Sequence, residues 1–186
     1  MHPDRFVWLG GRLSLDFCNT RLAERELIPT PEDLAEWLVA AELADDRPEV
    51  GARMHAAALE LRDDLRSCLL RQECGAVGRV AESWLDGVPG RLEVEPGTLR
   101  PRFVPQGCQT TCLLVPVVLD ALSVVRDRPR RVRSCANEEC PVLFEDTSRN
   151  GSRRWCSMDL CGSRSKSAAY YHRHRPAGEG AATLDL

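Results

Sequence analysis

The chain has 186 residues, of which 43% are hydrophobic and 28% charged, and a net charge of −3, which together exclude a fibrous or intrinsically disordered protein. No apolar run approaches the roughly 20 residues that cross a bilayer, and the first residues lack the basic and apolar regions of a secretion signal, so we expect a cytoplasmic protein with no membrane partner. Because cytosolic thiols stay reduced, the nine cysteines are expected to bind metal or pack in cores rather than form disulfides.

Apolar residues at helical spacing dominate the first two thirds of the chain. Ser14 is a candidate N-cap of the first helix, and Thr30 followed by Pro31 is a strong start signal for the second. Gly75 is expected to end the third helix. The predicted helices cover residues 14–24, 31–43, 48–74, 77–85 and 113–125.

Between the fourth and fifth helices the pattern changes to that of strands. Residues 92–95 and 98–104, separated by a Pro-Gly turn, predict a β-hairpin. We place a domain boundary at the polar stretch 126–130, and we expect the helical part to fold without the rest because it carries all the long amphipathic helices. The predicted domains are residues 1–128, a helical domain, and 129–175, a basic module, followed by a tail at 176–186 that we expect to be disordered.

Charge is distributed unevenly along the chain. Residues 1–125 contain 13 Arg and 20 acidic residues, a net charge of −7, whereas residues 126–175 contain 12 basic and 6 acidic residues, a net charge of +6. A basic module attached to an acidic body predicts a polyanion partner for the module alone.

The basic module contains two closely spaced pairs of cysteines. Cys135 and Cys140 are separated by four residues, as are Cys156 and Cys161, and 15 residues lie between the pairs. Four thiolates at this spacing predict one structural Zn²⁺ per chain, which would also supply the folding energy of a segment with few large apolar residues. Four buried thiols without metal and an iron–sulfur cluster are the alternatives, and the spacing resembles none of the common cluster motifs.

A hairpin and a helix are predicted around these cysteines. Residues 142–144 and 153–155 are the expected hairpin arms around an Asn-Gly turn, and Ser157 is a plausible N-cap for a helix running to about residue 174. The expected fold is therefore a mainly α N-terminal domain with a small β-hairpin, followed by a small treble-clef-like zinc finger of hairpin plus helix.

Several basic side chains fall on the predicted hairpin and helix. They are candidates for DNA contacts, and the alternative is an ordinary solvated charged surface. The candidate DNA-binding residues are Arg149, Arg153, Arg154, Arg164, Lys166, Arg173 and Arg175.

Three motifs in this module resemble the CGNR zinc-finger family, bacterial proteins thought to act as stress-responsive transcription regulators. The motifs are Asp146-x-Ser148, the run from Ser152 to Met158, and Cys161-Gly162-Ser163-Arg164-x-Lys166. Residues 15–20 are similar to the start of the ABATE domain, which precedes this finger in the family. Ser163 stands where the family has Asn, so one of the two polar groups of that amide is lost here.

Two polar residues, Asp16 and Asn19, lie at i and i+3 on the otherwise apolar first helix. They could line a pocket for a small effector, but such groups more often hydrogen-bond neighbouring main chain.

The leading hypothesis is a transcription regulator whose zinc finger contacts double-stranded DNA, while the helical domain senses a signal or forms a homodimer. The alternative is a zinc-dependent module that binds protein or RNA. An enzyme is disfavoured because the sequence contains no recognisable activated nucleophile, phosphate loop or open metal site.

Overall fold

The computed structural model describes residues 5–86, 88–94, 97, 101–106, 110–127 and 130–165. The helices are α1 (Leu13–Cys18), α2 (Pro31–Ala40), α3 (Ala52–Arg71), α4 (Cys74–Leu85), η1 (Thr110–Leu114), α5 (Val115–Asp127) and η2 (Met158–Gly162). The strands are β1 (Arg21–Leu22), β2 (Arg25–Glu26), β3 (Gly90–Val94), β4 (Pro101–Pro105), β5 (Val132–Ser134) and β6 (Leu143–Glu145). None of the described helices is long and apolar enough to cross a membrane. The predicted tail, 176–186, lies outside the described residues.

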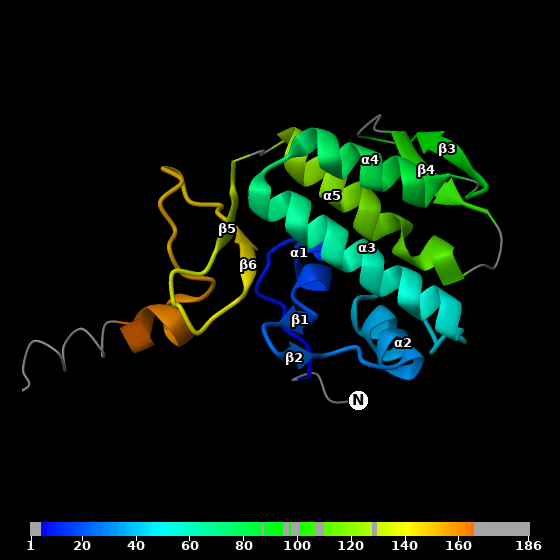
Figure 1. Ribbon diagram of the computed structural model, residues 1–186. Coiled ribbons are helices and arrows are strands. Elements are labelled where there is room, and N and C mark those ends of the chain that lie inside the picture. Colours follow the sequence, from blue (N-terminus) through cyan, green and yellow to red (C-terminus); the bar gives the residue numbers. More distant parts are fainter. Residues whose placement is uncertain are drawn as a thin grey trace, which may run out of the picture.

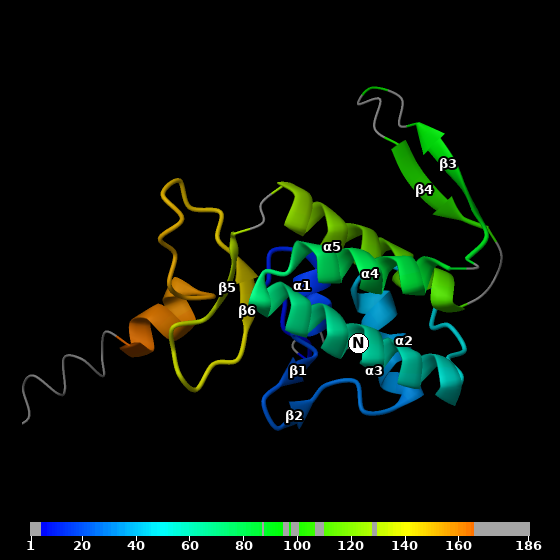
Figure 2. The same cartoon turned by 45° about the horizontal axis from the view of Figure 1, so that its top comes forward.

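Helix α3 is the scaffold of the helical part, and it contacts α1, α2, α4 and β5 (Figure 1). The short helix α1 packs against α5, α3 and β6, so it lies between the helical core and the finger. In both views the finger and the β3–β4 hairpin lie at opposite ends of the molecule (Figures 1 and 2). The expected fold class, a mainly helical domain followed by a small zinc-finger region, is confirmed.

Local signals set the ends of α2 and α3. Thr30 caps α2 and forms a reciprocal capping box with Asp33, and Pro31 occupies the first turn, as the sequence predicts. The end of α3 differs from the prediction. Gln72 takes the left-handed conformation at φ 57° and terminates the helix, whereas Gly75 lies inside α4.

The first helix is shorter than residues 14–24 because the chain leaves it to form a small hairpin. Helix α1 ends at Cys18, and the Thr20 hydroxyl donates to the Phe17 carbonyl at 2.7 Å. Ala23, at φ 52°, then turns the chain between β1 and β2. The prediction of a helix over 14–24 is therefore wrong beyond Cys18, because residues 21–24 belong to this hairpin.

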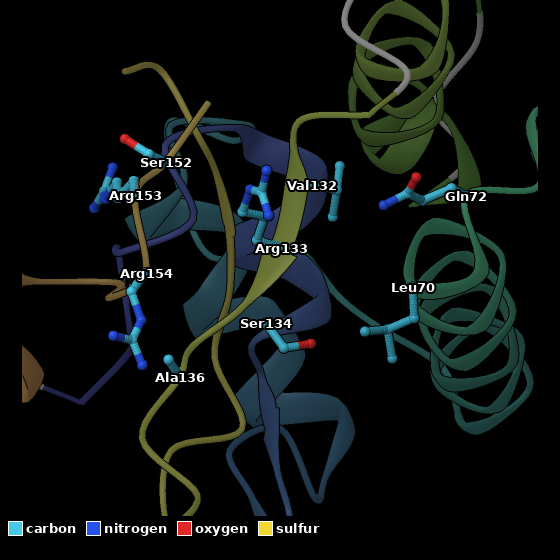
Figure 3. Close-up of a pocket in the computed structure, with 9 residues that line it drawn as sticks. All are labelled: Leu70, Gln72, Val132, Arg133, Ser134, Ala136, Ser152, Arg153 and Arg154. Carbon is cyan, nitrogen blue, oxygen red and sulfur yellow. The ribbon is translucent and has the colours of Figure 1, made fainter. Parts of the chain in front are cut away.

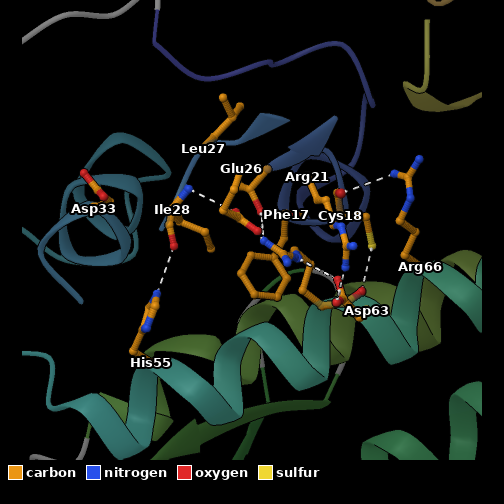
Figure 4. A network of polar contacts seen from close by, with 12 residues as sticks. Phe17, Cys18, Arg21, Glu26, Leu27, Ile28, Asp33, His55, Asp63 and Arg66 are labelled. Carbon is orange, nitrogen blue, oxygen red and sulfur yellow. Dashed lines mark hydrogen bonds and ion pairs between the residues drawn. The ribbon is translucent and has the colours of Figure 1, made fainter. Parts of the chain in front are cut away.

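A buried arginine, Arg62, attaches this hairpin to α3, and its carboxylate partners Glu26 and Asp63 are labelled in Figure 4. Arg62 is 1% exposed, and its guanidinium donates to Glu26 at 2.6 Å and to Asp63 at 2.9 Å. Two carboxylates therefore compensate the burial of one cation, the condition under which such a charge is tolerated in a core.

The remaining predicted elements are present with shifted ends. Strands β3 and β4 form the expected antiparallel hairpin, with Val94 opposite Pro101. The last predicted helix of this part consists of a 3₁₀ turn, η1, followed directly by α5.

Strand β6 connects two hydrophobic cores. Leu143, together with Val132 of β5, belongs to the large core of the helical part, whereas Val142 and Phe144 pack with the four clustered cysteines. Successive residues of a strand face opposite sides, so one short strand serves both cores. The two predicted domains therefore pack against each other. The domain boundary near residue 128 remains a prediction.

Candidate zinc centre and basic face

The four predicted cysteine ligands converge at one point. Their Sγ atoms all lie within 4.8 Å of one another, with 3.7 Å between Cys140 and Cys156 and 3.6 Å between Cys156 and Cys161. A tetrahedral zinc with bonds of about 2.3 Å to sulfur requires neighbouring sulfurs about 3.8 Å apart. The donor set and its spacing fit one Zn²⁺ with no position left open, which is a structural rather than a catalytic site.

The main chain brings the two cysteine pairs together. Cys135 follows β5, and its amide donates to the Val142 carbonyl at 3.0 Å. This bond closes the loop that contains both cysteines of the first pair. The amide of Ala136 donates to the Arg154 carbonyl at 2.8 Å and so ties the first pair to the segment that leads into Cys156. Ser157 accepts from the Leu160 amide, which confirms it as the cap of the helical turn that carries Cys161.

Burial keeps two of these thiols protonated in the absence of metal. It raises the pKa of Cys140 to about 11, and it also raises the pKa of Cys156. Zinc binds thiolates, so binding must release these protons.

The predicted hairpin of residues 142–144 with 153–155 is wrong. Strand β6 pairs instead with β5, with Phe144 opposite Arg133. The reason is Asp146, which is fully buried and accepts from the Ser148 amide and hydroxyl at 2.9 and 2.5 Å and from the Arg153 amide at 3.1 Å. This carboxylate draws the segment after β6 into a compact loop, and the Asn-Gly turn, with Gly151 at φ 61°, lies within that loop.

Arg153 is part of the internal structure of the finger. Its guanidinium lies over the Phe144 ring, 4.7 Å from the ring centre. Nε donates to the Trp155 carbonyl at 2.9 Å, and Nη2 donates to the carbonyl of the ligand residue Cys156. The planar fork thus connects the aromatic core of the finger to the main chain of the second cysteine pair.

The other predicted DNA-binding residues are differently placed. Arg154 is exposed, with its guanidinium 5.1 Å from the Trp155 ring centre, and Arg149 and Arg164 are exposed as well. Ser163, the substituted family position, donates its hydroxyl to the Met158 carbonyl at 3.1 Å. Three predicted residues lie outside the described part of the chain: Lys166, Arg173 and Arg175.

Two further arginines of the finger were not among the predicted DNA-binding residues. Arg131 and Arg133 flank the buried Val132 on β5. Arg131 donates to the Ser148 carbonyl at 2.7 Å, and Arg133 to Asp146 at 3.1 Å and the Gly151 carbonyl at 2.6 Å. The alternation of Arg, Val and Arg is the signal of a half-buried strand that could have identified them.

A hollow of about 320 Å³ opens beside these arginines (Figure 3). One wall comes from β5 and the segment 152–154, and the other from the C-terminal end of α3. Its lining residues are Leu70, Gln72, Val132, Arg133, Ser134, Ala136, Ser152, Arg153 and Arg154. We call it the basic hollow.

Asp16 and Asn19 use their polar atoms on main chain. The Asn19 amide is fully buried and accepts from the Leu143 N–H at 2.8 Å and donates to the Leu143 carbonyl at 2.9 Å. Asp16 accepts from the Gly10 N–H at 2.7 Å, and burial raises its pKa to about 6. Neither lines the basic hollow or the hollow on the other side of Leu70, so the idea of an effector pocket at these residues gains no support.

Comparison with known families agrees with this arrangement. Residues 11–128 match the ABATE model, described as "Putative stress-induced transcription regulator", and residues 131–174 match the CGNR zinc finger. Both descriptions are of non-enzymatic kinds of protein. The comparison with curated proteins found no match.

Proposed function

The chain belongs to the ABATE family and carries a CGNR zinc finger, and on that premise we propose that it regulates transcription by binding double-stranded DNA through the finger. In this proposal the zinc is structural. The helical domain receives a signal or pairs with a second copy of the chain, and sedimentation with and without DNA tests the pairing.

One observation carries the proposal, the exposed arginine Arg154. Its guanidinium lies against the Trp155 ring, which restricts the side chain without neutralising its charge. No carboxylate partner of Arg154 is found among the described ion pairs. A restricted guanidinium with no carboxylate partner among the described residues suits a phosphate or a guanine edge.

The experiment is a salt titration of zinc-loaded protein against promoter fragments from the source genome, using wild type, Arg154→Ala and Arg53→Ala. Arg53 is exposed near the start of α3, the end distant from the finger, and its replacement removes the same charge. Affinity of the wild type should fall steeply with salt as counterions are released. If Arg154 contacts a base edge, Arg154→Ala should weaken binding by about 5- to 100-fold, and if it contacts a phosphate, the variant should reduce the salt slope by about one. Arg53→Ala should behave as wild type.

A protein partner for the finger is the second candidate, and one observation favours it. Met158 and Leu160 are large apolar side chains of η2 that are 52% and 49% exposed. If wild type binds no DNA, or binds it independently of salt, this candidate replaces the first. A Met158→Ser, Leu160→Ser double variant should leave DNA affinity unchanged if the DNA proposal is right.

A further inference from the structure

The basic hollow lies at the interface between the finger and the helical domain. Arg133 and Ser134 reach it from β5, and Leu70 and Gln72 point toward β5 from the last turn of α3 (Figure 3). A molecule seated there would therefore touch residues of both family-matched segments.

The charge of the lining is of one sign. Three arginines and no carboxylate line the hollow. Arg153 is engaged by main-chain carbonyls, so the accessible charge comes from Arg133, whose side chain is 43% exposed although it also contacts Asp146, and from exposed Arg154. The accessible guanidinium groups favour an anionic group in the hollow.

Other surfaces of the finger and its surroundings are less suitable for an anion. Glu138 and Glu139 are exposed between the first two cysteines, and Asp159 is exposed on η2. The hollow on the other side of Leu70 contains Asp63, paired with Arg21 at 2.7 Å. Of these two hollows, the second is lined by two arginines and one carboxylate, whereas the basic hollow is lined by three arginines and no carboxylate.

We propose that a backbone phosphate of the DNA duplex lies in the basic hollow, so that the C-terminal end of α3 faces the DNA together with the finger. This inference rests on the proposed function and deepens it, because it assigns part of the interface to the helical domain. The carbonyls at the end of α3 carry a partial negative charge, which disfavours a phosphate, and the charge of Arg71 is compensated by Glu73 at 2.9 Å. The attraction for the phosphate therefore comes from Arg133 and Arg154.

Gln72 provides a direct test because it lies in the hollow, is exposed, and its side chain makes no hydrogen bond to the described part of the finger. Gln72→Glu should weaken DNA binding about two- to fivefold at low salt, and Gln72→Lys should strengthen it by a similar factor. Both effects should shrink as salt screens charges beyond about 8–10 Å. Damage to folding would weaken binding in both variants, so opposite changes in affinity identify a charge effect.

Matched controls are Gln106→Glu and Gln106→Lys. Gln106 is exposed directly after β4, at the end of the molecule opposite the finger, and these variants change the net charge identically. They should leave affinity unchanged. Circular dichroism and zinc content, measured on every variant, should match wild type.

The outcomes separate the two proposals. Suppose that wild type binds DNA and Arg154→Ala weakens this binding, but the Gln72 variants behave like the Gln106 variants. Then no DNA phosphate lies in the basic hollow, and the proposed function stands. If the Gln72 variants shift the binding of free inorganic phosphate but not of DNA, the hollow takes a small anion and the inference is overturned. If wild type fails to bind DNA, both proposals fail.

Discussion

At the scale of single residues, neighbouring arginines have different roles. Arg153 holds the carbonyls of Trp155 and Cys156, whereas Arg154 is exposed. Arg153→Ala should therefore release zinc to a chromogenic chelator several-fold faster than wild type. Arg153→Lys should restore little of the loss, because an ammonium lacks the planar fork.

Arg154→Ala is the matched control, since it should release zinc at the wild-type rate while weakening DNA binding. Equal release rates for wild type and Arg153→Ala would show that the guanidinium does not hold the second cysteine pair in place.

Asp16 gives a prediction about pH. Burial raises its folded pKa to about 6, above an unfolded value of about 3.9, so the charged form is disfavoured in the folded protein. The resulting penalty is full above the folded pKa and disappears as pH falls through the folded value toward the unfolded one. Asp16→Asn retains an acceptor for the Gly10 N–H and removes the penalty.

The variant should therefore be more stable than wild type at pH 7.5, by at most about 3 kcal/mol, and the difference should narrow at pH 4.5. Urea unfolding of both proteins at each pH measures this, and loss of zinc in acid affects both alike. A difference that stays constant with pH would contradict the assignment.

At the scale of elements, the outer edge of β6 is held at Glu145 by the Gly10 carbonyl and at Leu143 by the side chain of Asn19, the C-cap of α1. The Asn19 amide satisfies both polar groups of the Leu143 main chain. Asn19→Ala would leave a buried N–H and a buried C=O without partners, at a cost of about 2–5 kcal/mol in the free energy of unfolding.

Asn19→Asp is the sharper comparison. It keeps the acceptor for the N–H but turns an oxygen toward the Leu143 carbonyl, so it should be at least as destabilising as alanine. Denaturant unfolding measures both variants. Near wild-type stability in either variant would mean that water or another group replaces the Asn19 amide as the partner of the Leu143 main chain.

The sequence indicates these elements unevenly. The zinc ligands and the cap of α2 follow from local patterns, and both are found where the sequence predicts them. Strand pairing in the finger does not, because Asp146 selects the partner of β6 through hydrogen bonds that form only in the folded loop. Asn19 illustrates the same limit, since its partner lies 124 residues further along the chain.

At the scale of the whole molecule, the packing of finger and helical domain makes metal binding and helix stability interdependent. Val132 and Leu143 complete the large core, the Glu145 amide donates to the Gly10 carbonyl at 2.8 Å, and Arg66 donates to the Pro141 carbonyl at 2.6 Å. A chelator that removes zinc should therefore lower the melting temperature of the helical signal in far-ultraviolet circular dichroism.

The sequence predicts a helical domain that folds without the finger, and the shared core adds the expectation that this domain is less stable alone. A chain ending at Asp127 tests this directly, and we expect it to melt at a lower temperature than the zinc-loaded full chain because it lacks those contacts. Identical melting temperatures, together with no effect of the chelator, would show that the shared core adds nothing to the helical domain.

The two-sided strand β6 bears on how such a finger can be inherited. Its side chains alternate between the cysteine cluster and the helical core, so a graft of the finger onto an unrelated protein would expose Leu143 and leave its main chain without the Asn19 amide. A recombination event that moved only the cysteine-bearing segment would transfer the metal ligands without the surface against which they pack. A functional transfer of the finger should therefore require that α1 and Asn19 are transferred with it. Helix α1 and the finger together, rather than either part alone, would then be inherited as one module.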